Sequence, residues 1–351
     1  MFFASDNGGP VHPKVMESLA NANEGYAKGY GSDPVSEAAV AAIRDLFEAP
    51  DAAVYLVPTG TAANVLSLAT MAKPTDTIYC SALSHINVDE CNGPEFYTGG
   101  AKLLPVADDG AARISAAALD AAIGATALRG VHGAQRGPVS ITQATEMGTL
   151  YSVADITDIA KVADKFGSAL HLDGARFANA CAALGCTPAE MTWKAGVNAV
   201  SFGGTKNGCM AVEAAVLFDS TAAYDFELRR KRGGHLFSKH RYLAAQMLGY
   251  LTDGLWLELG ATANARAARL ANGLANAKGM DLLFPVEANM IFARMPRARH
   301  QALMNEGAIY YVEDGDVETG PADELLMGRF VCDWSIPETE IDRFLAIATA
   351  A

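Results

Sequence analysis

Between about residues 36 and 218, short apolar runs alternate with segments whose apolar residues recur every three or four positions. Val54–Val57 is a run of the first kind, whereas Val40, Ile43 and Leu46 show the second spacing. A short continuous run is typical of a buried strand, and the wider spacing is typical of an amphipathic helix. Strands that alternate with helices predict an α/β fold, a mostly parallel sheet with helices on both faces.

The predicted elements of this first part follow from the same pattern. We expect strands at 54–57, 77–80, 102–106, 128–132, 168–172, 197–202 and 211–218, and helices at 13–23, 36–47, 65–71 and 153–166. The last helix has Ser152 in the N-cap position and Asp155 in the place that a capping box requires.

After about residue 219 the pattern changes to a long helical periodicity at 238–278. Strands are expected at 288–294 and 328–332, and a closing helix at 337–348. These elements predict a smaller C-terminal α+β domain. We therefore divide the chain into an N-terminal arm (1–13), a large domain (14–237) and a small domain (238–351).

Composition narrows the class of protein. The 351 residues contain no apolar run that approaches a membrane span of roughly 18 residues, and the first residues lack the basic-then-apolar order of a signal peptide. The six cysteines have no metal-type spacing, so we expect free thiols, no metal site and a cytoplasmic protein. A formal charge of −13 argues against a nucleic acid partner.

A glycine-rich turn after the strand at 197–202 presents a single lysine, Lys206, between Thr205 and Asn207. Such a lysine can bind phosphate, act as a base or form a Schiff base. The strand at 168–172 ends in Asp173, with Arg176 three residues later. A carboxylate and a lysine at two strand ends suit pyridoxal phosphate, whose ring nitrogen pairs with the acid while the lysine holds the aldehyde carbon.

Three further segments carry candidate chemistry. Gly60 and Thr61 lie between a strand and a helix, where free N–H groups bind anions, although an ordinary capped helix fits equally well. His85 follows a strand and either has a structural role or stacks on the pyridine ring. His132 is expected at the carboxyl edge of the strand at 128–132, where open α/β sheets carry their chemistry.

Taken together, these segments resemble the low-specificity L-threonine aldolase family, a branch of the fold-type I pyridoxal phosphate enzymes grouped with the β-eliminating lyases. The motifs that carry the resemblance run through nearly the whole chain: Ser5–Asn7, Tyr30–Pro34, Pro58–Asn64, Ser84–Ile86, His171–Arg176, Ser201–Gly208 and Arg329. Each motif is short, but their order and spacing are jointly specific.

The resemblance implies a role for each candidate residue. Lys206 would hold pyridoxal 5'-phosphate through a Schiff base, Asp173 would pair with the ring nitrogen, and His85 would stack on the ring. Gly60, Thr61 and Thr205 would bind the cofactor, while Ser5, Arg176 and Arg329 would bind the substrate carboxylate. Family members are dimers or tetramers with shared sites. Tyr30 and part of the basic segment 229–240 would therefore reach a neighbouring subunit's site, with Arg232, His235 and Lys239 as phosphate candidates.

The implied activity is the reversible cleavage of L-threonine, L-allo-threonine and other β-hydroxy-α-amino acids, including phenylserine types, to glycine and an aldehyde. The base for the β-hydroxyl group is His132, His85 or an ordered water. The alternatives are a β-eliminating lyase or an aminotransferase. A non-catalytic binding protein of this fold would require loss of the lysine or its acid partner, and Lys206 and Asp173 are both present.

Overall fold

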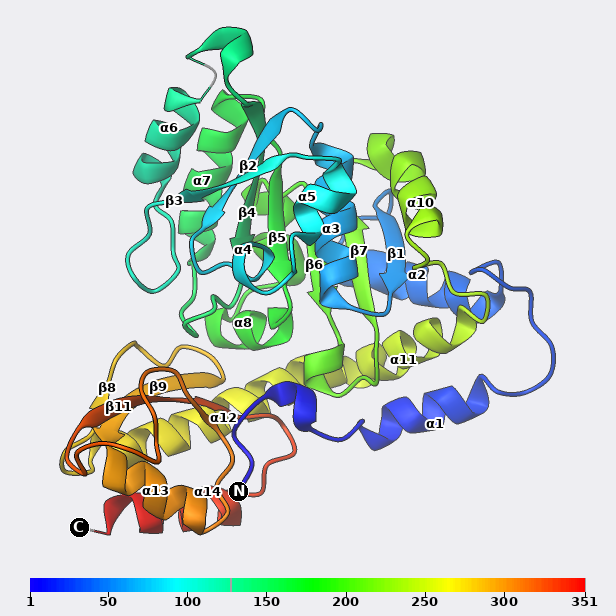
Figure 1. Cartoon of the computed structure of the whole chain (residues 1–351). Helices are drawn as coiled ribbons and strands as arrows, with labels where there is room; N and C mark the ends of the chain where they lie inside the picture. The colour runs from blue at the N-terminus through cyan, green and yellow to red at the C-terminus, as the bar shows by residue number, and fades with distance from the viewer. Residues whose placement is uncertain (127, 351) are drawn as a thin grey trace.

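The structure is a computed structural model that describes residues 1–126 and 128–350. It consists of a large and a small lobe, each built on its own sheet (Figure 1). The seven strands of the large sheet lie in the order β1 (Ala53–Val57), β7 (Glu213–Leu217), β6 (Ala199–Gly203), β5 (Leu170–Gly174), β4 (Gln135–Thr142), β2 (Asp76–Ser81) and β3 (Lys102–Val106). β7 pairs antiparallel with β1 and β6, and the other pairs are parallel, as the sequence predicts.

Helices cover both faces of this sheet. One core contains side chains of α2 (Pro34–Leu46), α6 (Ala116–Ala125), α7 (Val153–Lys165), α8 (Phe177–Leu184) and α11 (Arg241–Leu251). On the opposite face lie α3 (Gly60–Met71), α4 (His85–Val88), α5 (Gly93–Thr98) and α10 (Ala223–Arg232). Because both faces are covered, the five residues of β1, β5, β6 and β7 are all buried, which explains their continuous apolar runs.

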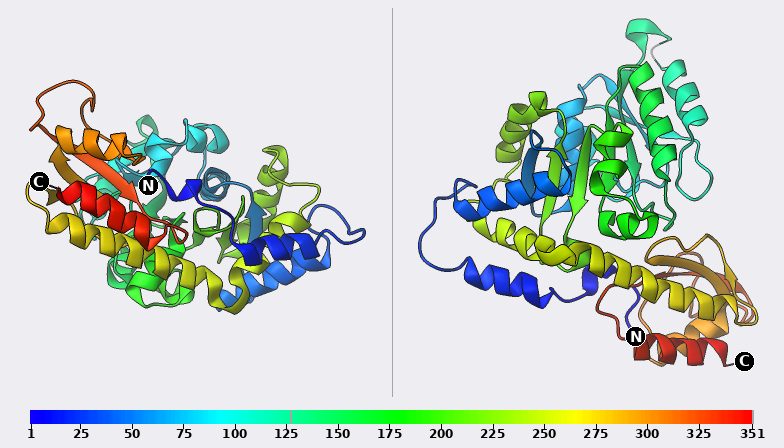
Figure 2. Two further views of the ribbon diagram at one scale, coloured as in Figure 1. Left: turned by 90° about the horizontal axis from the view of Figure 1, so that it is seen from below. Right: turned by 180° about the vertical axis from the view of Figure 1, so that it is seen from behind.

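The small lobe contains a four-stranded antiparallel sheet in the order β10 (Tyr311–Val312), β11 (Leu325–Val331), β9 (Met290–Pro296) and β8 (Asp281–Leu282). Its helices are α12 (Leu255–Ala275), α13 (Arg297–Asn305) and α14 (Glu338–Thr349), and α12 and α14 lie side by side in both views of Figure 2. The short helix α9 (Pro188–Met191) belongs to the large lobe. No helix of the described residues is long and apolar enough to cross a membrane.

The N-terminal arm connects the two lobes. Phe3 is buried in the core of the small lobe, where its N–H donates to Ile309 O (2.8 Å) and its carbonyl accepts from Val331 N (2.8 Å). The chain then forms α1 (Pro13–Asn21), which packs along α11 beneath the large lobe. The division at residue 237 stays a prediction; α12 passes from the large core at Leu259 to the small core at Leu270.

Most predicted elements of the large lobe are confirmed, including the capping box of Ser152 and Asp155. The strand predicted at 128–132 is wrong: residues Gly130–His132 form one turn of 3₁₀-helix, and the strand at this point of the sheet is β4. Gly137 and Pro138 interrupt its apolar run, which conceals it in the sequence. Gly137 is required there, because a Cβ atom would lie 2.6 Å from Thr77 O on the neighbouring strand.

Gly260 allows α12 to approach α8, and this contact generates a prediction. A Cβ atom at Gly260 would lie 2.7 Å from the carbonyl carbon of Ala178, which is backbone and cannot rotate away. We expect Gly260→Ala to lower the free energy of unfolding by about 1–3 kcal/mol in chemical denaturation. The matched control is Gly124→Ala in α6, where the nearest atom, Phe166 Cζ, is 4.0 Å away. The control should stabilise by about 0.5–1 kcal/mol; equal stability of Gly260→Ala and the wild type would contradict the contact.

Candidate active site

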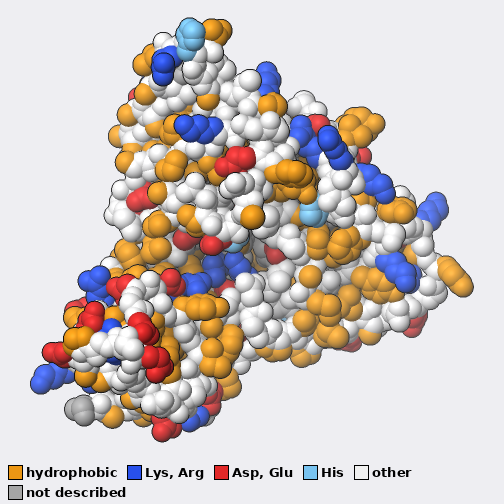
Figure 3. Space-filling view, in the orientation of Figure 1, with side chains coloured by type: hydrophobic (Ala, Val, Ile, Leu, Met, Phe, Trp, Pro, Cys, Tyr) orange, Lys and Arg blue, Asp and Glu red, His pale blue; other side chains and the backbone are white. Residues whose placement is uncertain are grey.

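The candidate site lies at the edge of the large sheet where the parallel strands end. Thr142 ends β4, Asp173 lies near the end of β5, and Lys206 follows β6. Since β7 runs in the opposite direction, its first residue, Glu213, reaches the same edge. Figure 3 shows Lys and Arg side chains gathered in the hollow where the two lobes meet.

Two adjoining cavities occupy this position. The inner cavity, about 250 Å³, is lined by Asn7, Pro58, Thr59, Gly60, Thr61, Asn64, His85, Thr142, Ala144, Glu146, Asp173, Ala175, Arg176, Thr205, Lys206 and Glu213. The outer cavity, about 410 Å³, is lined by Ser5, Asn7, Leu83, His85, Val88, Asp89, Glu146, Met147, Arg176, Lys206, Met290, Phe292, Glu313, Met327 and Arg329. Asn7, His85, Glu146, Arg176 and Lys206 line both, so the two cavities share a wall.

Asp173 is buried and held by two hydrogen bonds. Its Oδ1 accepts from Ala175 N (3.0 Å) and its Oδ2 accepts from Asn64 Nδ2 (2.8 Å). The same amide nitrogen donates to Glu90 Oε1 (2.9 Å), and that oxygen lies 2.8 Å from His85 Nδ1. The aspartate and the imidazole thus belong to one hydrogen-bonded chain, in which Asn64 and Glu90 are residues that sequence reasoning missed.

Lys206 faces the inner cavity from a 3₁₀ turn, Thr205–Asn207, directly after β6. Burial lowers the pKa of its ammonium group and the nearby Arg176 lowers it further, while Asp6, Asp173 and Glu213 oppose the change. Burial raises the pKa of Glu213 to about 7, although this carboxylate accepts from Gly204 N (2.8 Å). A lowered pKa favours the neutral amine, which is the nucleophilic form of lysine.

The first turn of α3 also lines the inner cavity and has the features of an anion site. Thr59 caps the helix, and its Oγ1 accepts from Ala62 N (3.1 Å). The N–H groups of Gly60 and Thr61 precede that bond and have no partner within the helix. A Cβ atom at Gly60 would meet no atom within 4 Å, so the space before the helix is open to a phosphate group. The inner cavity therefore contains groups that suit a phosphate, in the first turn of α3, and a lysine that suits an aldehyde, Lys206.

The predicted carboxylate-binding residues lie on the outer side. Arg176 forms a bidentate pair with Asp6, from Nε to Oδ2 (2.7 Å) and from Nη2 to Oδ1 (3.0 Å). Asn289 from the small lobe also donates to Asp6 Oδ2 (3.0 Å). Ser5 and Arg329 line the outer cavity beside them. Sequence reasoning missed Asp6, although it lies inside the quoted motif Ser5–Asn7.

His132 does not belong to this site. It precedes β4 and is exposed at the amino-terminal edge of the strand, whereas Thr142, at the carboxyl end, lines the inner cavity. The sequence placed His132 at the carboxyl edge of the sheet because it predicted a strand at 128–132, which the structure does not contain. His132 is therefore not in position to act as the base. Tyr30, Arg232, His235 and Lys239 line neither cavity of this chain.

Glu146 is a further residue of the cavity wall that the sequence did not single out. It lies between β4 and α7, and its Oε1 accepts from His85 N (2.9 Å) and Thr142 Oγ1 (2.7 Å). The segment Ala144–Glu146 carries no motif by which the sequence could have marked it.

The contact between His85 and Glu90 generates a pKa prediction. The hydrogen bond with Glu90 raises the pKa of His85 above its ordinary value of 6.5, against the effect of burial. Glu90→Gln keeps the shape of the side chain and removes its charge, so the pKa of His85 should fall. Titration of the ring proton resonances by NMR measures this value, with His12, which packs against Trp334 outside both cavities, as an internal control. An unchanged His85 titration would contradict the pairing.

Comparison with known proteins agrees with this geometry. The family model described as beta-eliminating lyase matches residues 3–297. Two curated low specificity L-threonine aldolases, from Pseudomonas sp. and Pseudomonas aeruginosa, are each 39% identical to the chain. The matches cover 98% and 99% of this chain and 96% and 95% of theirs. The solved structure of Leishmania major threonine aldolase has a TM-score of 0.91 at 27% identity, over 99% of this chain and 98% of that one. The chain therefore belongs to the beta-eliminating lyase family, within its low-specificity L-threonine aldolase branch, and the family and fold-type I architecture expected from the sequence are confirmed.

Proposed function

We propose that this protein is a pyridoxal phosphate-dependent aldolase that cleaves L-threonine, L-allo-threonine and related β-hydroxy-α-amino acids to glycine and an aldehyde. The observation that carries the proposal is the inner cavity, in which Lys206, Asp173, His85 and the open first turn of α3 meet. Both curated relatives bear the name of this activity.

In this proposal each part of the cofactor is bound by different residues. Lys206 would hold the aldehyde carbon, Asp173 would pair with the ring nitrogen, His85 would cover the ring, and Gly60, Thr61 and Thr205 would bind the phosphate. When bound, the cofactor accepts the electron pair of the bond that breaks at the substrate Cα. Asp173 supports that chemistry because a carboxylate stabilises the protonated ring nitrogen. Its two hydrogen bonds fix the carboxylate in place.

The substrate carboxylate would bind Ser5, Arg176 and Arg329 in the outer cavity. Asp6 occupies two donors of Arg176 and fixes the plane of its guanidinium group, leaving Nη1 for the substrate. Fixing the carboxylate decides which Cα bond faces the cofactor for cleavage. The fixed position of the carboxylate also selects one configuration at Cα, so we expect D-isomers not to react.

Low specificity at Cβ is consistent with the wall of the outer cavity. The apolar side chains that line it are Leu83, Val88, Met147, Met290, Phe292 and Met327. Methionine has three rotatable bonds and adapts to ligands of different shape. We expect this wall to accept methyl and aryl substituents on Cβ with little discrimination.

We further propose a homo-oligomer with shared sites, a dimer or a dimer of dimers, and a cytoplasmic location. Tyr26, Tyr30, Tyr224, Leu228 and Phe237 are exposed large apolar residues near the basic segment, and burial of such a patch stabilises association. In a dimer, Tyr30 and one of Arg232, His235 and Lys239 would reach the partner's site. Cys80, Cys181, Cys209 and Cys332 are buried free thiols, which suits a reducing compartment.

The activity is tested by product identification with L-threonine, L-allo-threonine, L-phenylserine, L-serine and D-threonine. We expect glycine and the matching aldehyde from the three L-β-hydroxy substrates that carry a Cβ substituent, with phenylserine fastest because its aldehyde is conjugated. D-threonine should remain intact. A 2-oxo acid with ammonia would indicate a β-eliminating lyase instead, and amino group transfer to a 2-oxo acid would indicate an aminotransferase.

Lys206→Ala should abolish steady turnover and the covalent attachment of the cofactor while the protein remains folded. The measurement is borohydride reduction of the holoenzyme followed by peptide mass spectrometry, which should label Lys206 in the wild type. Lys194→Ala is the control, because Lys194 pairs with Glu48 (2.6 Å) outside both cavities and its loss should leave the label at Lys206. Labelling of a different lysine in the wild type would refute the assignment.

A further inference from the structure

Glu146 lies in the wall that the inner and outer cavities share. Its Oε1 is anchored by the N–H of His85 and the hydroxyl of Thr142. Its Oε2 is buried and has no hydrogen-bond partner among the described residues. A buried oxygen without a partner is rare in native proteins and calls for an explanation such as a ligand group that completes the bonding.

Glu146 can both accept and release a proton near neutral pH. Burial raises the pKa of its carboxyl group to about 7 and the charge of Asp173 adds to the rise, while Thr142 and the N–H groups of Glu146 and His85 oppose it. A pKa close to the working pH is the property that a general acid–base group requires.

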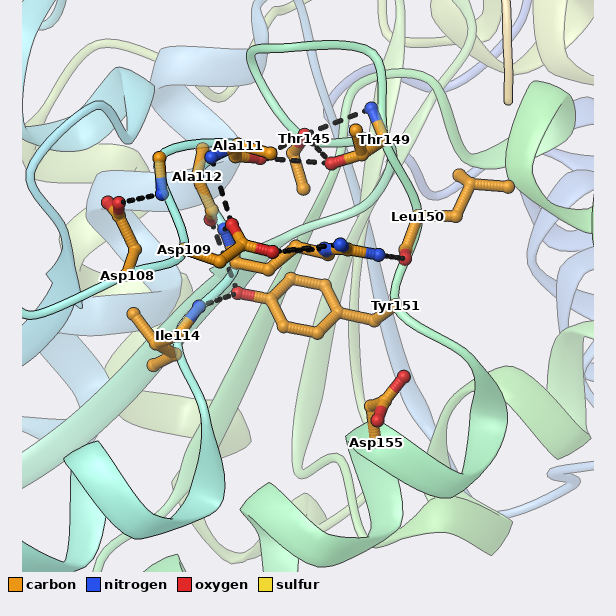
Figure 4. Close-up of polar contacts among 12 residues, drawn as sticks. Asp108, Asp109, Ala111, Ala112, Ile114, Thr145, Thr149, Leu150, Tyr151 and Asp155 are labelled. Carbon is orange, nitrogen blue, oxygen red and sulfur yellow. Dashed lines mark hydrogen bonds and ion pairs between the residues drawn. The ribbon is translucent and has the colours of Figure 1, made fainter. Parts of the chain in front are cut away.

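The residues around Glu146 are hydrogen-bonded to the loop 111–114, and Figure 4 shows these bonds for Thr145, Thr149, Leu150 and Tyr151. The hydroxyl groups of Thr145 and Thr149 both donate to Ala111 O, at 3.1 and 2.9 Å. Tyr151 OH accepts from Ile114 N (2.7 Å), and Arg113 Nη1 donates to Leu150 O (3.2 Å). The residues that flank Glu146 are thus anchored to the loop 111–114, while its own Oε1 is held by His85 N and Thr142 Oγ1.

The other candidate bases are less suited to the β-hydroxyl group. The Nδ1 atom of His85 is already engaged by Glu90 Oε1 at 2.8 Å, and that hydrogen bond raises the pKa of the imidazole. His171 lies behind the site between Ser140 and Ser201, where burial lowers its pKa to about 4. Glu213 lines only the inner cavity, whereas Glu146 also reaches the outer one.

Charged and titratable groups face Glu146 from several elements. Cys80 on β2, His85 on α4, Asp173 on β5, Tyr151 before α7, and Arg176 and Lys206 in the shared wall are its neighbours. The outer cavity adds Asp89, Glu313 and Arg329. Any pH dependence assigned to Glu146 must therefore disappear when Glu146 alone is replaced.

We propose, resting on the aldolase function above, that Glu146 is the catalytic base that removes the proton from the β-hydroxyl group of the substrate. The O–H bond breaks and its proton moves to Oε2, while the O–H electron pair forms the carbonyl bond of the departing aldehyde. The Cα–Cβ electron pair remains on Cα. Lys206 then supplies a proton to Cα and regains one from solvent, and Glu146 releases the proton that it took to solvent, so that both groups end in their starting states. In the synthetic direction Glu146 protonates the aldehyde oxygen.

The test compares two reactions of the holoenzyme. Glu146→Gln keeps the shape and removes the titratable group, so kcat/KM for phenylserine cleavage should fall roughly 10²–10⁴-fold. Exchange of the α-proton of glycine involves no Cβ oxygen and should change by less than about threefold. Glu318→Gln, at an exposed position of the small lobe, is the matched control for both reactions.

A second measurement does not depend on turnover. Infrared difference spectra of the wild-type holoenzyme should show protonated carboxyl bands of Glu146 and Glu213 that disappear as the pH rises through about 7. Only the contribution of Glu146 should be lost in Glu146→Gln. Thr142→Val removes a hydrogen bond that favours the charged carboxylate, so the infrared transition and the rising limb of the cleavage rate should both move to higher pH.

The outcomes separate the two proposals. Unchanged cleavage in Glu146→Gln, or an equal loss of cleavage and exchange, would overturn the role of Glu146 and leave the aldolase function intact. An unmoved rate limb in Thr142→Val would also overturn it. A wild-type enzyme that exchanges the glycine proton but cleaves none of the β-hydroxy substrates would refute the aldolase function itself.

Discussion

The amide group of Asn64 connects the parts of the site that must act together. Its nitrogen donates to Asp173 and to Glu90, and Glu90 in turn bonds His85. Two buried carboxylates close together are costly unless shared donors satisfy them. Because Asn64 belongs to the first turns of α3, the same helix that opens its N-terminus toward the inner cavity also fixes the aspartate and the imidazole. The open first turn of α3, the carboxylate of Asp173 and the imidazole of His85 are therefore connected in one unit.

The sheet supports this unit through its order of strands. β4, β5 and β6 are adjacent and parallel, so their carboxyl ends present Thr142, Asp173 and Lys206 along one line. β7 runs in reverse between β6 and β1 and brings Glu213 to the same edge at its first residue. The small lobe contributes Arg329 and Met327 from β11 to the outer cavity. The flexible methionine side chain can adapt its shape, whereas Thr142 and Asp173 at the sheet edge are fixed by hydrogen bonds.

The sequence was informative wherever a function is encoded locally. Lys206 and Asp173 stand out because each follows an apolar strand within a few residues, and the alternation of elements predicted the large sheet. Asp6 and Asn64 could not be identified, since their roles arise from partners 170 and 109 residues away. Glu146 has no distinctive neighbours in sequence, and its importance comes from burial. His132 was misplaced because Gly137 and Pro138 hide a strand whose close approach to β2 only tertiary structure reveals.

The N-terminal arm imposes an order on the completion of the site during synthesis. Phe3 forms backbone hydrogen bonds with Ile309 and Val331, and Asp6 accepts a hydrogen bond from Asn289. The residues synthesised first therefore cannot form these contacts until residues near the end of the chain have been synthesised. The seven-stranded sheet can form as soon as β7 is made, because domains fold as units while the chain emerges. Arg176 nevertheless remains without its carboxylate partner until the arm docks on the nearly finished small lobe. A nascent chain can thus have a folded large lobe before Asp6 holds Arg176 in place.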